Sequence, residues 1–163
     1  MAKTRTFKDW VDKSWKLPGV VLNPFLAIDL QSLGRLDVDL VEQWKFEPEL
    51  IVPPTNEKDQ LFNIQESLRQ QKSFEYSRLW VLAGYEIAMQ LKNNDPEKFR
   101  DTYNLFRKVR VPLVRYEKAG KNGDGQQIAM PGINTDIGEI GWEIEQGVFV
   151  TRNELAEKLF GVI

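Results

Sequence analysis

The chain has 163 residues, with 22 basic and 24 acidic side chains and a formal net charge of −2. It contains neither Cys nor His, which excludes disulfides, metal ligation by thiolate or imidazole, and catalysis by Ser-His-Asp or Cys-His groups. Apolar residues make up 42% of the chain, enough for an ordinary hydrophobic core at this length. We therefore expect a single domain over residues 1–163, divided into residues 1–55, 56–119 and 120–163.

The N-terminal part predicts three short helices. Thr6 is a favoured N-cap residue, and apolar side chains at helical spacing follow it, so a helix is expected over residues 7–16. An Asn-Pro pair then indicates the start of a second helix over residues 24–33, and Gly34 is placed to end it. A third short helix is expected over residues 37–44.

Two longer helices are predicted next, and they should pack against each other. The first starts between residues 56 and 59 and runs to about Asn93. Its first apolar face is marked by Leu61, Ile64 and Leu68. Asp95 is a typical N-cap, and Pro96 suits the first position of the helix that follows. Pro112 lies inside the apolar pattern of that second helix, which predicts a kink or an end there. The short connection favours an antiparallel pair.

The C-terminal part combines strand and helix signals. The residues after the helix pair are loop-like, with one short strand expected near residues 127–130. Apolar residues alternate over residues 140–145, and residues 148–150 can return as the second strand of a hairpin. Thr151 and Glu154 fit a capping box that opens a final helix. The expected class is therefore α+β, mostly α: a helical bundle built on a long antiparallel pair, with a C-terminal β-hairpin and a capped helix.

Glu86 is the most unusual residue of the first long helix. It lies in an otherwise apolar run and in line with Leu79, Leu82 and Met89 at helical spacing. Arg110 has a similar place on the second long helix. A carboxylate among apolar neighbours is costly unless it is paired, so we expect a mostly buried Glu86–Arg110 ion pair that fixes the register of the two helices. A ligand pocket and a catalytic carboxylate are weaker alternatives.

Basic charge is concentrated near the end of the second long helix. Residues 60–121 carry 12 bases and 7 acids, whereas residues 122–163 carry 2 bases and 7 acids. Within residues 104–121 the candidate phosphate contacts are Arg107, Lys108, Arg115, Lys118 and Lys121. Two structural interpretations are alternatives to phosphate binding. Bases near the C-terminal end of a helix stabilise the helix dipole, and the acidic C-terminal part can neutralise their charge.

Metal and cofactor sites are not expected. A glycine-rich loop before Pro131 resembles part of a calcium loop, but aligned on Gly125 it places Gly120 and Pro131 where two of the strongest ligands belong. The acidic residues Asp37, Asp39 and Glu42, like the glutamates after residue 138, are best explained as solvated acidic faces. No cofactor-binding or nucleophile motif is present.

The function suggested by these features is a non-enzymatic interaction or regulatory module, such as a small subunit of a larger bacterial or viral assembly. The alternative is a nucleic-acid-binding subunit that uses residues 104–121. We expect a protein partner, no catalytic residues, no membrane segment and a cytoplasmic location. The apolar runs are far too short to span a bilayer, and the N-terminus lacks the apolar core of a signal peptide.

Overall fold

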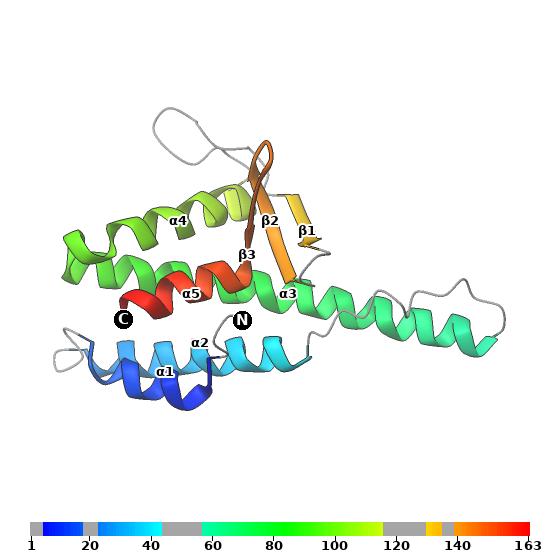
Figure 1. The fold of residues 1–163 in the computed structure, drawn as a ribbon, viewed down its shortest axis with the longest axis horizontal. Coiled ribbons are helices and arrows are strands. Elements are labelled where there is room, and N and C mark those ends of the chain that lie inside the picture. Colours follow the sequence, from blue (N-terminus) through cyan, green and yellow to red (C-terminus); the bar gives the residue numbers. More distant parts are fainter. Residues whose placement is uncertain (1–4, 18–22, 44–56, 116–129, 135–138) are drawn as a thin grey trace.

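The computed structural model describes residues 5–17, 23–43, 57–115, 130–134 and 139–163, which form a mostly helical α+β fold (Figure 1). The elements in these ranges, in chain order, are α1 (Phe7–Ser14), α2 (Pro24–Gln43), α3 (Glu57–Asn94), α4 (Pro96–Arg115), β1 (Met130–Asn134), β2 (Glu139–Glu145), β3 (Val148–Thr151) and α5 (Arg152–Val162). The predicted fold class is confirmed.

Three helix starts follow from local hydrogen bonds that the sequence predicted. At α1, the Thr6 hydroxyl accepts the N–H of Asp9 at 3.2 Å, and the Asp9 carboxylate accepts the N–H of Thr6 at 2.9 Å. The same reciprocal box, between Thr151 and Glu154, opens α5. The carboxylate of Asp95 accepts an N–H of the first turn of α4 at 3.1 Å. Each cap satisfies backbone donors that a helix start leaves unpaired.

Helix α2 is continuous where two helices were expected. Gly34 does not end a helix but lies buried inside α2, facing Trp10 of α1. A Cβ atom at Gly34 would lie 2.3 Å from Cγ of Trp10. The glycine therefore serves the close approach of two helices, and the predicted break between residues 33 and 37 is wrong.

Helices α3 and α4 pack side by side in opposite directions, as predicted (Figure 1). Gly84 allows this close contact, because a Cβ atom there would lie 2.4 Å from the ring of Phe106. The rings of Trp80 and Phe106 lie 5.9 Å apart in the same seam. Helix α4 continues through Pro112 to Arg115, so it does not end at the proline.

The N-terminal part of α3 projects beyond the other described helices and the sheet (Figure 1). Among the side chains that the structure describes on this helix, the first buried one belongs to Ser73. We call residues 57–72 the arm and the remaining described residues the body. Sixteen helical residues at 1.5 Å each give the arm a length of about 24 Å.

The described strands form one antiparallel sheet in the order β1-β2-β3. Strands β2 and β3 are the predicted hairpin, and Gly147 takes the left-handed conformation in its turn, with φ of 75°. Strand β1 adds a third strand that was not predicted at these residues, because Pro131 and Gly132 interrupt its apolar pattern. Residues 127–129 of the strand expected near 127–130 lie outside the described residues.

The hydrophobic core lies where α1, α2, α3, α4, α5 and the sheet meet. Its largest fully buried side chains are Trp10, Trp80, Trp142, Phe99 and Phe106. Helix α5 contributes Leu155 and Leu159, which are also fully buried. The core thus draws on both ends of the described chain.

Candidate functional site

An apolar stripe runs along one side of the arm. Leu61, Ile64 and Leu68 follow one another at spacings of three and four residues, which places them on one face of the helix. Their exposed fractions are 58%, 57% and 53%. We call these three residues the arm stripe. Full burial stabilises a side chain of this size by roughly 1.5–3 kcal/mol, so a partner that covers the stripe gains from each of them.

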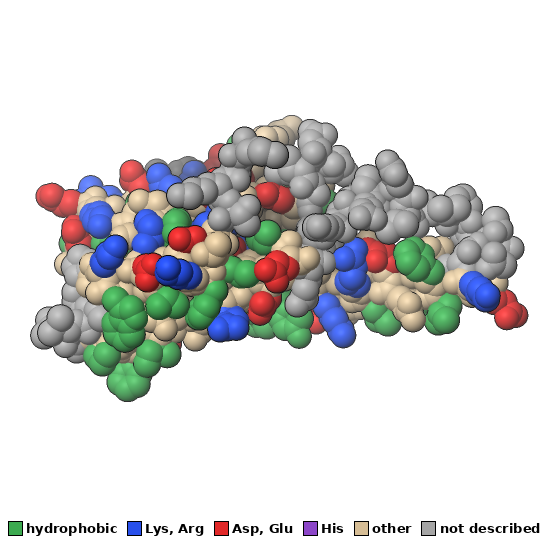
Figure 2. All heavy atoms as spheres, turned by 60° about the horizontal axis from the view of Figure 1, so that its bottom comes forward, with side chains coloured by type: hydrophobic (Ala, Val, Ile, Leu, Met, Phe, Trp, Pro, Cys, Tyr) green, Lys and Arg blue, Asp and Glu red, His purple; other side chains and the backbone are tan. Residues whose placement is uncertain are grey.

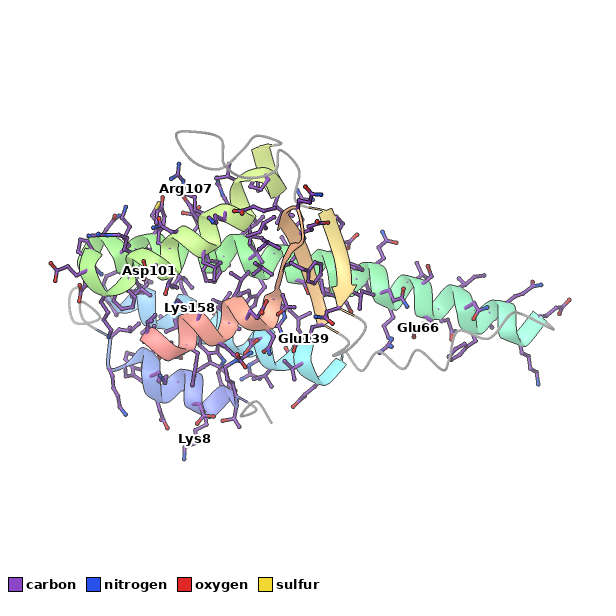
Figure 3. All side chains as sticks on the ribbon, turned by 45° about the horizontal axis from the view of Figure 1, so that its top comes forward. Lys8, Glu66, Asp101, Arg107, Glu139 and Lys158 are labelled. Atoms are coloured by element: carbon purple, nitrogen blue, oxygen red, sulfur yellow. The ribbon has the colours of Figure 1, made fainter. Side chains whose placement is uncertain are left out.

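The arm stripe faces away from the core. Ile64 and the buried Ser73 are nine residues apart, or two and a half helical turns, so they lie on opposite sides of α3. Figure 3 shows the arm side chains, Glu66 among them, projecting beyond the sheet and the other described helices. Glu66 is paired within the arm, with Arg69 at 2.6 Å. A second helix can therefore lie along the stripe without meeting the body.

A second exposed apolar region lies on α2. Phe25 and Ile28 are exposed there, and Figure 2 shows hydrophobic side chains gathered on this face of the body. An open groove of about 300 Å³ between α2 and α3 is lined by Asp29, Ser32, Leu33, Leu36, Ala83, Glu86, Ile87 and Gln90. Its lining includes two carboxylates and no base, so it favours apolar or cationic groups over anions.

Asp37 forms the centre of a buried polar cluster. Its Oδ2 accepts hydrogen bonds from Nε of Arg5 at 2.9 Å and from Nε1 of Trp10 at 3.2 Å. Its Oδ1 accepts from Nη2 of Arg5 at 3.3 Å and from Nη1 of Arg152. Arg5 also donates to the side-chain oxygen of Asn153. The cluster joins α1, α2 and α5, and Glu157, 3.7 Å from Nη1 of Arg5, adds a second, half-exposed carboxylate at its edge.

The charge state of Asp37 follows from these contacts. Burial, the largest single influence, raises the pKa of its carboxyl group. The hydrogen bond from Arg5 and the positive charges of Arg152 and Arg5 together outweigh burial, so the pKa lies below its ordinary value of 3.8. Asp37 is therefore ionised at neutral pH. Only 1% of the Asp37 side chain is exposed, so a substrate cannot reach it. The role of Asp37 is to connect helices.

The expectation that Asp37 belongs to a solvated acidic face is wrong. Leu30, Leu33 and Leu40 are all buried on α2, and Asp37 lies in line with them at spacings of three and four residues. That alignment was the available sequence signal for burial. The partners that make the burial possible lie in distant segments, and nothing local to α2 identifies them.

A groove of about 510 Å³ lies between α1 and α5. It is lined by Arg5, Asp9, Asp12, Lys13, Lys16, Glu157, Phe160 and Gly161. Nζ of Lys13 donates to the carbonyl of Phe160 at 2.6 Å and lies 4.3 Å from the centre of its ring. Burial, followed by the charges of Lys98 and Lys16, lowers the pKa of Lys13. Because charges of both signs line this groove, it does not select a ligand by charge.

Glu86 and Arg110 meet, but not as a buried pair. Their closest N···O distance is 3.9 Å, and the side chain of Glu86 is 53% exposed. The guanidinium of Arg110 lies over the ring of Tyr85, with 4.8 Å to its centre. The prediction of burial is wrong. The residues of α3 that pack on the core between Trp80 and Leu91, with Gly84 among them, lie on one face of the helix, and Glu86 lies on the other face. In a continuous apolar run, spacing alone does not reveal which face is buried.

We expect Glu86→Ala to change the free energy of unfolding by less than about 1 kcal/mol, because exposed ion pairs contribute only about 0–1 kcal/mol. Urea melts of Glu86→Ala, Arg110→Met and the double variant measure the effect and the coupling between the two side chains. A loss of 3 kcal/mol or more on Glu86→Ala, the size typical of a broken buried pair, would contradict the exposed position.

The candidate phosphate contacts are only partly described, and the described ones do not form a free basic surface. Nζ of Lys108 lies 3.0 Å from the carboxylate of Glu145 on β2. Arg107 lies on the outer side of α4 (Figure 3). Three other basic residues have side chains outside the described part of the structure: Arg115, Lys118 and Lys121. The acidic C-terminal part thus neutralises the basic segment at one described position, Lys108.

Within the described ranges, no helix combines the length and the apolar character that crossing a bilayer requires. In the same part of the chain, no three carboxylates gather where they would hold a metal ion. Comparisons of the chain with protein-family models, with curated proteins and with solved structures gave no match.

Proposed function

We propose that this chain is a non-enzymatic interaction module, a small cytoplasmic subunit of a larger bacterial or viral assembly, and that it binds its assembly through the arm stripe. The observation that carries the proposal is the exposure of Leu61, Ile64 and Leu68 on a helix that projects from the body. Contiguous exposed apolar side chains on a projecting element are typical of an interaction site.

The stripe favours an amphipathic helix as its partner. It is one helical face wide, and its three- and four-residue spacings match the spacings on a second helix that packs alongside. The arm also lacks support from the body along residues 57–72. A helix of this length is marginal without packing, so a partner helix would stabilise the arm as it binds.

The alternative, a nucleic-acid-binding subunit that uses residues 104–121, has less support. A phosphate-binding surface needs basic side chains that are free to meet the backbone of the nucleic acid. Lys108 instead pairs with Glu145, and Arg110 stacks on Tyr85. Two of the three bases described in this segment are thus engaged within the chain.

The proposal is tested by photo-crosslinking in the cell that makes the protein. Benzoylphenylalanine is placed at Ile64 on the stripe or, as a control, at the exposed Lys8 on α1. We expect a discrete protein adduct from position 64 and none of the same mass from position 8. Nuclease treatment should leave the adduct unchanged.

Matched variants connect the adduct to the apolar side chains. Leu61→Gln with Leu68→Gln should abolish the adduct and leave the melting temperature nearly unchanged, because both side chains are exposed on the arm. Ile28→Gln, which replaces an exposed apolar side chain on α2, should preserve the adduct. A stripe variant that retains the full adduct would contradict the proposal.

A further inference from the structure

The arm is complementary to a second arm that runs in the opposite direction. We propose that the occupant of the arm stripe is the arm of a second copy of this chain, so that the module is a homodimer joined by an antiparallel pair of arms. The inference rests on the proposed function, because it names the partner of the same stripe. Two features of residues 57–72, their apolar spacing and their charges, carry it.

The apolar residues match in an antiparallel alignment. If the midpoint of the pair lies between Ile64 and Gln65, residues at equal distances on either side of it lie next to each other. Leu61 then lies beside the partner's Leu68, and two-fold symmetry repeats the contact with the roles exchanged. Four leucines are covered in a single arrangement, together with Ile64 of each chain near the axis.

The charges that flank the stripe select the same alignment. Glu57 lies four residues before Leu61, and Lys72 lies four residues after Leu68, so both are on or beside the face of the stripe. Both side chains are exposed. The antiparallel alignment places Glu57 beside the partner's Lys72 and repeats this ion pair at the other end. A parallel pair would place Glu57 against Glu57 and Lys72 against Lys72, which is repulsive at both ends.

The body does not obstruct this pairing. The arm extends about 24 Å before the first buried residue, Ser73, and the stripe points away from the core face. When residues 57–72 of the two chains overlap in opposite directions, the body of each chain begins beyond Glu57, the first described residue of the other arm. The two bodies therefore lie at opposite ends of the pair.

Reciprocal charge reversal tests the alignment, with the dissociation constant measured by analytical ultracentrifugation. Glu57→Lys alone and Lys72→Glu alone each turn both flanking attractions into repulsions and should weaken the dimer by about tenfold. An equimolar mixture of the two variants should restore dimerisation, because each variant supplies the charge that the other lacks. Arg100→Glu, an equal charge reversal at an exposed site on α4, should leave the dimer unchanged.

Single cysteines test the direction, and the natural absence of cysteine makes each new thiol unique. Ile64→Cys lies near the two-fold axis and should form an inter-chain disulfide under mild oxidation. Lys72→Cys should not, because the two thiols of an antiparallel pair would lie about 22 Å apart along the axis. A disulfide from Lys72→Cys would indicate a parallel pair, in which position 64 also meets position 64, and would overturn the inference.

The outcomes separate this inference from the proposed function. A wild-type dimer whose charge variants rescue each other supports both. If the wild type is monomeric and the thiol of the Ile64→Cys variant reacts with maleimide as fast as in urea, the homodimer is overturned and the stripe remains available to another protein. If the wild type is monomeric and that thiol reacts only after unfolding, both proposals are overturned, because the chain then covers its own stripe.

Discussion

Replacing Asp37 by Ala should lower the free energy of unfolding by about 3–5 kcal/mol, measured by urea denaturation at pH 7. The carboxylate is the only acidic group in direct contact with both Arg5 and Arg152 among the described residues, and all three side chains are largely buried. Its removal leaves Arg152 without the carboxylate that it contacts, Arg5 with only the half-exposed Glu157 at 3.7 Å, and the indole N–H of Trp10 without its acceptor. Stranded buried charge costs more than the ion pair itself contributes.

Two further variants separate this effect from an ordinary loss of charge. Asp29→Ala makes the same substitution on the exposed side of α2 and should change stability by no more than about 0.5 kcal/mol. Arg152→Met added to Asp37→Ala should recover part of the loss, because it removes one of the stranded charges. If Asp37→Ala were no more destabilising than Asp29→Ala, the cluster would not hold the helices together.

The pH dependence has a definite sign. Because the pKa of Asp37 is lower in the folded chain than its ordinary value of 3.8, its contribution to stability is fully present above that value and is lost as the pH falls through the folded pKa. The difference in unfolding free energy between the wild type and Asp37→Ala should therefore be constant from pH 7 to about pH 4 and shrink only below it. Shrinkage near pH 6 would indicate a raised pKa instead.

Gly34→Ala should destabilise the chain by about 1–3 kcal/mol, although alanine is the better helix former. In the interior of a helix, replacing Gly by Ala gains about 1 kcal/mol of propensity. At Gly34 the new methyl group would lie 2.3 Å from Cγ and 2.5 Å from Cβ of Trp10, so α1 must move. Such overpacking typically costs 1–3 kcal/mol or more, and here it also disturbs the indole that bonds to Asp37.

Gly161→Ala provides the matched control. Gly161 lies near the end of α5, and a Cβ atom there would meet nothing within 4 Å. Only the propensity gain applies at this position, so the variant should be as stable as the wild type or more stable by up to about 1 kcal/mol. Thermal and urea unfolding of the two glycine variants should therefore shift in opposite directions. A shift of Gly34→Ala in the stabilising direction would rule out the tight contact with Trp10.

The helix starts were predictable because capping is local. Thr6, Asp95 and Thr151 each bond to a backbone N–H three residues further on, and such short spacings are visible in a sequence. The antiparallel packing of α3 and α4 followed from the same kind of signal, a cap and a proline between two apolar patterns. The hairpin of β2 and β3 was also local, since alternation and a turn glycine define it.

The errors arose where distant residues decide the outcome. Gly34 has the same local pattern whether it ends a helix or admits a neighbouring indole, and Trp10 is 24 residues away. Glu86 lies in a run where every face is apolar, so the choice of core face depended on Gly84 and its contact with α4. Asp37 is bonded to side chains at positions 5 and 152, and no local pattern identifies such partners.

The arm stripe was predicted as a helical face and not as a surface. Leu61, Ile64 and Leu68 marked an apolar face of the first long helix, which normally indicates packing against the same chain. The body covers α3 only from Ser73 onwards, which leaves this face of the arm exposed. How far a bundle extends along its longest helix is a property of the whole fold.

The Asp37 cluster also determines when the chain can finish folding during its synthesis. Asp37 and Arg152 are 115 residues apart in sequence, and Arg5 and Asn153 are 148 apart. At about 5–20 residues per second, a ribosome needs roughly 6–23 s to pass from the first member of the closer pair to the second. Throughout that interval α1 and α2 lack the residues of α5 that complete their core and their ion pairs. Nascent chains halted before residue 152 should therefore remain sensitive to protease along α1 and α2, and resistance should appear only once α5 has left the exit tunnel.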